Sequence, residues 1–195
     1  MRGERALRSP RNITGFRSLA RDRPFSSMNE YVAARPAVTV AAVVERDGAF
    51  LLVRERTRRG LRLNQPAGHL ESGESLPDGT ARETLEEAAW HVEPFALVGI
   101  YRWQAPDNGA TFVRFAYAAR PLSHEPDRRL DAEIVDARWL RYDEIIARRD
   151  EHRSPLVLRC IDDYRAGRRW PLAAVEEVQG EGSAGLAGER PGDAW

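Results

Sequence analysis

The stretch that decides the fold is residues 68–87, GHLESGESLPDGTARETLEE. Its glycine-bearing first half predicts a loop, and Ser75 is a suitable N-cap for a helix that runs to about residue 88. Side chains three and four residues apart lie side by side on a helix, so Glu83, Glu86 and Glu87 would converge on one face. Like charges at this spacing oppose helix formation, which favours a compensating cation, and a divalent metal ion with oxygen ligands is the economical candidate.

The composition of the whole chain is that of an ordinary globular protein. Its 195 residues are 42% hydrophobic and 31% charged, which suits one domain with a full core. Thirty basic residues balance thirty acidic ones, and a net charge of zero argues against a nucleic-acid backbone or a membrane surface as the main partner. The longest apolar run, 37–44, is too short to cross a bilayer. We therefore expect a cytoplasmic protein, with the lone Cys160 as a packed core thiol.

The two ends of the chain differ in composition from its middle. Residues 1–35 begin with an arginine-rich segment without apolar periodicity, and we expect a disordered extension with no catalytic role, with Met28 as an alternative start of the protein. An arginine-rich, acid-poor leader is also typical of a transit peptide, but no helical stripe accompanies it. The Gly, Glu and Ala mixture of residues 174–195 predicts a disordered tail. The domain itself is expected over residues 36–173.

Apolar periodicity outside the opening stretch predicts both strands and helices. The Asp47-Gly48 pair between two apolar runs indicates a hairpin, because its turn needs positive φ. Ser154-Pro155 opens a last amphipathic helix that Gly167 is placed to end. The expected strands are 37–45, 49–55, 63–67, 95–103, 111–119 and 134–140, and the expected helices are 75–88, 142–149 and 154–166.

The opening stretch resembles the Nudix box, G-x5-E-x7-R-E-U-x-E-E-x-G-U with U an apolar residue. The matching positions are Gly68, Glu74, Arg82, Glu83, Glu86 and Glu87. Six fixed positions at about 6% each give a chance match of roughly one in a hundred thousand in a chain of this length. Two positions depart from the pattern, since Thr84 replaces an aliphatic residue and Ala89 replaces glycine. A left-handed Ala89 would cost about 1–2 kcal/mol, so we expect the end of the helix to be adjusted there.

The resemblance implies a fold and a set of roles. The implied fold is α/β, a single-domain Nudix α/β/α sandwich with a mixed β-sheet. Glu83, Glu86 and Glu87, with the backbone carbonyl of Ala67, would hold Mg²⁺ or Mn²⁺ and so activate a water that attacks phosphorus. The supporting residues are Gly68 and the pair Glu74 and Arg82, a salt bridge that orients the glutamates.

Segments outside the box resemble a phosphatase subgroup of the same family. These segments are 64–71, 103–107, 138–139, 153–157 and 171–172, within residues 38–172. The resemblance implies action on nucleoside tri- and diphosphates, thiamine diphosphate and hydroxymethylpyrimidine diphosphate, with release of inorganic phosphate. It implies a small-molecule substrate as the partner, without nucleic acid or membrane, and a monomer. The alternatives are another Nudix pyrophosphohydrolase, acting on ADP-ribose, dinucleoside polyphosphates or RNA 5′ ends, and a non-catalytic Nudix-fold nucleotide sensor.

The general base for the attacking water is sought outside the box, ahead of the Arg138-Trp139 strand. Glu133 is the first candidate and Asp136 the second, and for both an exposed loop acid is an equally good interpretation. His69 could contact phosphate, although a loop histidine beside Gly68 is more often a packing or hydrogen-bonding residue.

Aromatic and basic residues are candidates for substrate binding. Tyr101 and Trp103 would stack on a heterocyclic ring. Strand alternation places both on one face, although strand aromatics more often belong to the core. Arg114 is the first candidate for a phosphate contact, followed by Arg102 and Arg153. The arginines of the loop at 54–62 could also reach phosphate, but solvated loop charges are the commoner interpretation.

Overall fold

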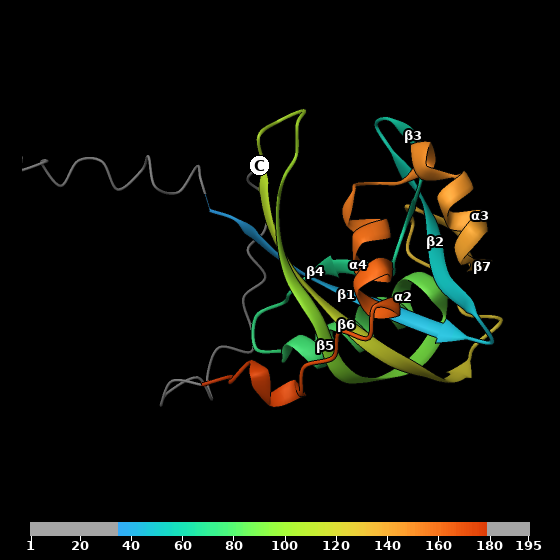
Figure 1. The fold of residues 1–195 in the computed structure, drawn as a ribbon. Coiled ribbons are helices and arrows are strands. Elements are labelled where there is room, and N and C mark those ends of the chain that lie inside the picture. Colours follow the sequence, from blue (N-terminus) through green and yellow to red (C-terminus); the bar gives the residue numbers. More distant parts are fainter. Residues whose placement is uncertain (1–34, 179–195) are drawn as a thin grey trace, which may run out of the picture. The chain divides into compact units, whose positions relative to one another are not determined.

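The computed structural model describes residues 35–178 (Figure 1). The predictions for the N-terminal extension up to residue 34, for Met28 and for the tail beyond residue 178 lie outside the described residues. The elements are β1 (Ala37–Arg46), β2 (Ala49–Thr57), β3 (Gly60–Asn64), β4 (Ala67–His69), α2 (Leu76–Ala88), β5 (Trp90–Gln104), β6 (Thr111–His124), β7 (Ile134–Arg141), α3 (Tyr142–Ala147), the 3-10 turn η2 (Arg149–Glu151), α4 (Leu156–Arg165) and the 3-10 turn η3 (Leu172–Ala174). Within 35–178, no helix is long and apolar enough to span a membrane.

Strand β1 is the centre of a mixed sheet of seven strands. It runs parallel to β6 and antiparallel to β4, and its end forms the hairpin with β2. The strand order is β3-β2-β1-β6-β5, with β4 also paired to β1 and β7 to β2. Because β1 is covered on both faces, its residues form a nearly continuous apolar run instead of an alternating one.

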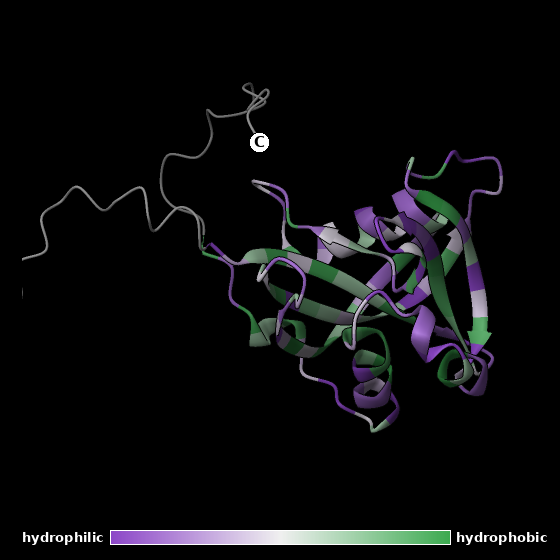
Figure 2. Ribbon diagram, turned by 90° about the horizontal axis from the view of Figure 1, so that it is seen from above, coloured by the Kyte–Doolittle hydropathy of each residue, from purple (hydrophilic) through white to green (hydrophobic). Residues whose placement is uncertain are grey.

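Alternate residues of β1 divide the core into two layers. Ala41 and Val43 pack in one cluster with Val157 of α4, whereas Val44 packs in another with Ala88 of α2. The sheet therefore lies between α2 and α4, which is the predicted sandwich, and Figure 2 shows its central strands as mostly hydrophobic. Cys160 is fully buried in the α4 layer, as expected.

The local signals at the hairpin and the helix cap are confirmed. Asp47 and Gly48 take φ values of 53° and 78° in the turn between β1 and β2. The hydroxyl of Ser75 accepts a 3.1 Å hydrogen bond from the backbone N–H of Asp78 at the start of α2. These two turns set the register of β2 and the direction in which α2 leaves the loop.

The end of α2 differs from the prediction. Ala89 itself takes the left-handed conformation, with φ 57° and ψ 26°, and its N–H donates to the Leu85 carbonyl at 3.0 Å. The expectation of an adjusted helix end is therefore wrong. The cap hydrogen bond and the burial of the Ala89 methyl group, which is 3% exposed, offset the strain that a glycine would avoid.

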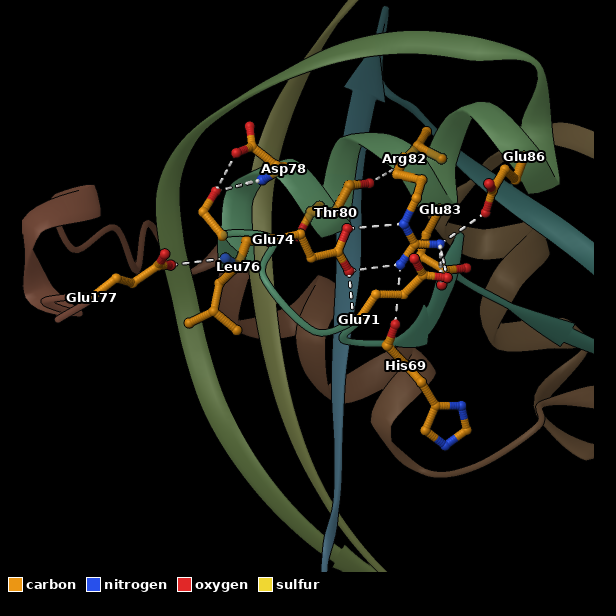
Figure 3. Close-up of polar contacts among 12 residues, drawn as sticks. His69, Glu71, Glu74, Leu76, Asp78, Thr80, Arg82, Glu83, Glu86 and Glu177 are labelled. Carbon is orange, nitrogen blue, oxygen red and sulfur yellow. Dashed lines mark hydrogen bonds and ion pairs between the residues drawn. The ribbon is translucent and has the colours of Figure 1, made fainter. Parts of the chain in front are cut away.

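The first residues of the predicted tail have contacts with the domain. After η3, the Glu177 carboxylate accepts a 2.8 Å hydrogen bond from the backbone N–H of Leu76 (Figure 3). This N–H is one of the free donors at the start of α2, so Glu177 supplies a capping acceptor from a distant part of the chain. The folded domain thus extends past the expected boundary at residue 173.

Candidate active site

The loop before α2 is held against the helix at a glycine. Gly68 lies in β4, paired with Val40 of β1, and a Cβ at this position would overlap the carboxylate of Glu83. Only a glycine lets the backbone approach the carboxylate this closely. The supporting role implied for Gly68 therefore has a steric basis.

Arg82 ties the glutamates of the loop and the helix together (Figure 3). Its Nε and Nη2 donate to the two carboxylate oxygens of Glu74, at 2.9 and 2.8 Å. Its Nη1 donates to Glu83 at 2.9 Å and to Glu86 at 2.8 Å, and Nη2 also reaches the His69 carbonyl at 3.1 Å. The predicted ion pair between Glu74 and Arg82 is present and bidentate, and the same guanidinium orients two of the three helix glutamates.

Glu87 is the most perturbed of these carboxylates. Its Oε2 accepts a 2.8 Å hydrogen bond from the backbone N–H of Ala67. Burial, with smaller contributions from the nearby Glu83 and Glu55, raises the pKa of Glu87 to about 8, although the hydrogen bond from Ala67 acts in the opposite direction. Burial also raises the pKa of Glu83. Burial therefore disfavours the charged form of both carboxylates more than their hydrogen-bond partners favour it.

The donor set fits a hard divalent cation in its chemistry. Carboxylate oxygens and a backbone carbonyl are the ligands that Mg²⁺ and Mn²⁺ prefer. Within residues 35–178, no three His, Cys, Asp or Glu side chains already form a metal cage, since Arg82 holds Glu83 and Glu86 while Ala67 holds Glu87. A metal ion would therefore replace hydrogen bonds that now hold these carboxylates.

A cavity of about 450 Å³, here called the central pocket, brings most of the predicted residues together. One wall, here called the acidic wall, comes from the loop and α2 and includes Ala67, Gly68, Glu83 and Glu87. The opposite wall, here called the facing wall, comes from distant segments and includes Trp103, Phe112, Arg114 and Arg153. Glu133 and His69 also line the pocket, whereas Glu74, Arg82 and Glu86 lie behind or beside the acidic wall.

Arg114 lines the central pocket and has one buried donor that is unused. Its side chain is buried, and Nη1 lies 3.4 Å from the Asn64 amide oxygen. Its Nε has no hydrogen-bond partner in the described part of the chain. A buried guanidinium that lacks a partner favours an incoming oxygen acceptor such as phosphate.

The two aromatic candidates occupy different places although they share a face of β5. Both pack on the core cluster beneath α4. The Tyr101 hydroxyl donates to Asp163 at 3.0 Å, and Tyr101 does not line the central pocket. Trp103 lies nearer the end of the strand, lines the pocket and stacks on Phe112 with ring centroids 5.6 Å apart. The structure therefore places Tyr101 in the core, as the alternative interpretation had it, and Trp103 at the site.

The two candidates for the general base also separate. Glu133 is exposed and lines the central pocket. Asp136 pairs with Arg54 at 2.5 Å and with Arg138 at 2.8 Å, and the Arg54 hydrogen bonds lower the pKa of Asp136 to about 2. Asp136 does not line the pocket; it lies opposite Arg54 in the pairing of β7 with β2, and this cross-strand neighbour holds its carboxylate.

Three carboxylates that were not predicted as site residues line the central pocket, namely Glu55, Glu71 and Asp107, and Glu55 is the most buried of them. Glu55 lies in β2 where the pairing with β7 shifts register, and its side chain is 13% exposed. Its Oε1 lies 3.1 Å from Nε of Arg153. Burial raises the pKa of Glu55, and the guanidinium of Arg153 opposes that effect. In the sequence Glu55 is one charge among several at the end of a strand, and its place in the site is set by the distant segments that line the pocket with it, such as the one that carries Arg153.

The fold and the site define a class of protein. A mixed sheet between two helices, with a glycine loop that leads to a helix bearing three glutamates, has the architecture and chemistry of a Nudix hydrolase. The family model for the NUDIX domain matches residues 33–160. The chain belongs to the Nudix family and is a Nudix hydrolase.

The relatives specify the subgroup. The protein named Phosphatase NudJ of Escherichia coli (strain K12) is 38% identical over 141 residues, which are 72% of this chain and 91% of that protein. The protein of the same name from Shigella boydii serotype 4 (strain Sb227) gives the same values. A solved structure of a NUDIX hydrolase from Nitrosomonas europaea has a TM-score of 0.72 at 48% identity and covers 74% of this chain and 98% of that chain. The chain is therefore similar to NudJ phosphatases over most of their length.

Proposed function

We propose that this Nudix hydrolase is a Mg²⁺- or Mn²⁺-dependent phosphatase of small phosphoanhydrides. The proposed substrates are nucleoside tri- and diphosphates, thiamine diphosphate and hydroxymethylpyrimidine diphosphate. The observation that carries the proposal is the central pocket itself, which Glu83 and Glu87 line together with Arg114, a residue whose Nε has no hydrogen-bond partner within residues 35–178. Similarity to proteins named Phosphatase NudJ supports release of phosphate as the reaction.

Each wall of the pocket has its own part in the proposal. Arg114 and Arg153 would hold phosphate oxygens, and Trp103 would stack on the ring of the substrate. A divalent ion bound by Glu83, Glu86, Glu87 and the Ala67 carbonyl would neutralise phosphate charge and lower the pKa of the attacking water.

The water would attack phosphorus in line with the leaving phosphoanhydride oxygen. Glu133 is the proposed acceptor of its proton, because it lines the pocket and, unlike Asp136, has no ion pair within residues 35–178. A group that takes a proton in the transition state typically contributes about 10²–10⁴-fold to the rate.

The central test is a phosphate-release assay on nucleotides and thiamine-pathway diphosphates with and without Mg²⁺. Glu86→Gln is expected to lower turnover by about a thousandfold while the variant stays folded, since a metal ligand is lost without a change of volume. Glu93→Gln is the matched control, because Glu93 is an exposed surface partner of Arg120. Full turnover of Glu86→Gln at saturating Mg²⁺ would refute the metal assignment.

Product analysis separates the proposal from its alternatives. Inorganic phosphate supports the phosphatase, whereas diphosphate or two nucleotide halves would indicate another Nudix pyrophosphohydrolase. Nucleotide-induced stabilisation without product over hours would indicate a sensor. We also propose that the enzyme works as a cytoplasmic monomer, which light scattering on the purified protein and fractionation of the cells that make it would check.

A further inference from the structure

A second cavity, here called the distal cleft, adjoins the central pocket. Its volume is about 640 Å³, and the two cavities share the side chains of Trp103 and Arg153 among their lining residues. Arg59, Ser154 and Leu156 also line both cavities, whereas Arg149 of η2 and Arg159 of α4 line only the distal cleft. A ligand that passes Trp103 would therefore enter the distal cleft without crossing the protein core.

The distal cleft carries an excess of positive charge. Its lining contains four arginines and one acid, Asp162, and the Asp162 carboxylate already accepts a 2.6 Å hydrogen bond from Tyr142. Arg149 is exposed and has no ion pair within residues 35–178. Within the described residues, the Arg149 side chain is therefore a positive charge of the cleft that is available to bind an anion.

The pairing of the other arginines leaves part of their charge available as well. Arg159 shares its partner Asp163, at 3.0 Å, with Arg168 at 3.5 Å, so one carboxylate serves two guanidinium groups. Arg59 and Arg153 pair with Asp107 and Glu55, respectively. The side chain of His152 also lines the cleft, and burial lowers its pKa, so it adds no charge at neutral pH.

The position of the cleft relative to Trp103 identifies the kind of ligand. Trp103 lies between the two cavities as a shared wall, with the acidic residues and Arg114 on one side and Arg149 and Arg159 on the other. A planar ring stacked on Trp103 would place its diphosphate in the central pocket. The ribose joins the stacked ring to the diphosphate, and a second phosphate on its 2′ or 3′ oxygen branches away from the 5′-diphosphate. With the diphosphate in the central pocket, this branch would face the arginines on the other side of Trp103, which bind phosphate well.

We propose that the distal cleft is a subsite for a second phosphate group, so that the enzyme prefers nucleoside diphosphates that carry a further phosphate on the ribose. This inference rests on the proposed function of the central pocket, because it concerns a second phosphate group of the same substrate. Discrimination comes from Arg149 and Arg159.

A binding experiment tests the subsite without requiring turnover. Calorimetry at about 0.15 M salt compares AMP with adenosine 3′,5′-bisphosphate, which differ only in the distal phosphate. We expect the bisphosphate to bind about five- to tenfold tighter than AMP to the wild-type protein. One or two contacts with partly exposed arginines give an affinity gain of about this size. In Arg149→Ala this advantage should fall to less than about twofold. Arg148→Ala is the matched control, since Arg148 is adjacent but does not line the cleft, and it should keep the advantage.

Turnover of the corresponding diphosphates gives a second measurement. Adenosine 3′-phosphate 5′-diphosphate should exceed ADP in kcat/KM by a similar factor, and Arg149→Ala should remove the difference with little change for ADP. Equal affinity of AMP and the bisphosphate for the wild type would overturn the subsite, whatever the turnover. Tighter binding of the bisphosphate without hydrolysis of either diphosphate would instead uphold the subsite and refute the proposed phosphatase.

Discussion

The acidic wall of the central pocket and the wall facing it are built in opposite ways. The acidic wall comes from one continuous stretch, the β4 loop and α2, and its carboxylates are already organised by Arg82. The other wall takes Trp103 from β5, Arg114 from β6 and Arg153 from the segment before α4. Local sequence therefore sets the proposed chemistry, while the fold as a whole assembles the surface that selects a substrate.

The largest expected effect is on the acidic wall, at Glu87. Glu87→Gln should reduce turnover by about a thousandfold or more and remove the rise in melting temperature that Mg²⁺ produces in the wild type, because the ligand charge is lost. The glutamine oxygen can still accept the hydrogen bond from Ala67, so circular dichroism should show an intact fold. Retention of the Mg²⁺-induced shift would mean that Glu87 is not a ligand.

In the absence of metal, Glu87→Gln should be more stable than the wild type, although it loses activity. The pKa of Glu87 is about 8 in the folded protein against an ordinary value of 4.5. A carboxyl with a raised folded pKa stabilises the fold fully only below pH 4.5, and this contribution is lost as pH rises toward 8. Glu87→Gln should therefore gain stability over the wild type across this range in chelator, as urea unfolding would measure. A constant difference between pH 4.5 and 8 would contradict the raised pKa.

The next effect concerns the acid at the mouth of the pocket. Glu133→Gln should lower kcat by about 10²-fold with little change in KM, as expected for a lost proton acceptor. Asp136→Asn should keep its activity but lose about 1 kcal/mol of stability, since a partly exposed carboxylate paired with two arginines is neutralised. That loss should vanish as pH falls from about 4 toward 2, because the Asp136 pKa is lowered to about 2. The reverse pattern of activities would exchange the two roles.

A smaller effect is expected on the facing wall, at Trp103. Trp103→Ala should raise KM about tenfold for nucleotides and change kcat little, because stacking holds the ring away from the reacting phosphorus. Trp103→Phe should recover most of the loss by keeping an aromatic face. An equal loss of kcat in both variants would mean that Trp103 supports the structure of the pocket and not the binding of a ring.

The smallest effect is expected at the end of α2. Ala89→Gly should remove left-handed strain of about 1–2 kcal/mol, but it also loses a buried methyl group and increases the freedom of the unfolded chain. These contributions nearly cancel, so thermal unfolding should shift by less than about 1 kcal/mol and activity should stay unchanged. A stabilisation above about 2 kcal/mol would show that the cap at Ala89 is more strained than its hydrogen bond to Leu85 suggests.

The site was predictable where function depends on neighbours in sequence. The ion pair of Glu74 with Arg82 and the shared helix face of Glu83 and Glu86 follow from spacing on one loop and one helix. The sequence left Tyr101 open between the site and the core, because alternation gives the face of a strand but not the point at which the strand leaves the core. Glu55 was missed because its role depends on contact with Arg153, which is distant in sequence, and no local pattern links the two residues.

The sequence by itself determined the class of enzyme and the residues of the acidic wall, because a helix converts fixed spacing into fixed geometry. Tertiary structure alone decided that Arg114 is buried with a free donor, that Glu133 and not Asp136 reaches the pocket, and that a cationic cleft continues beyond Trp103. These features depend on contacts between segments 40 to 100 positions apart, such as Asn64 with Arg114 and Glu55 with Arg153. Such contacts are set by sheet order and helix packing, which no local pattern encodes.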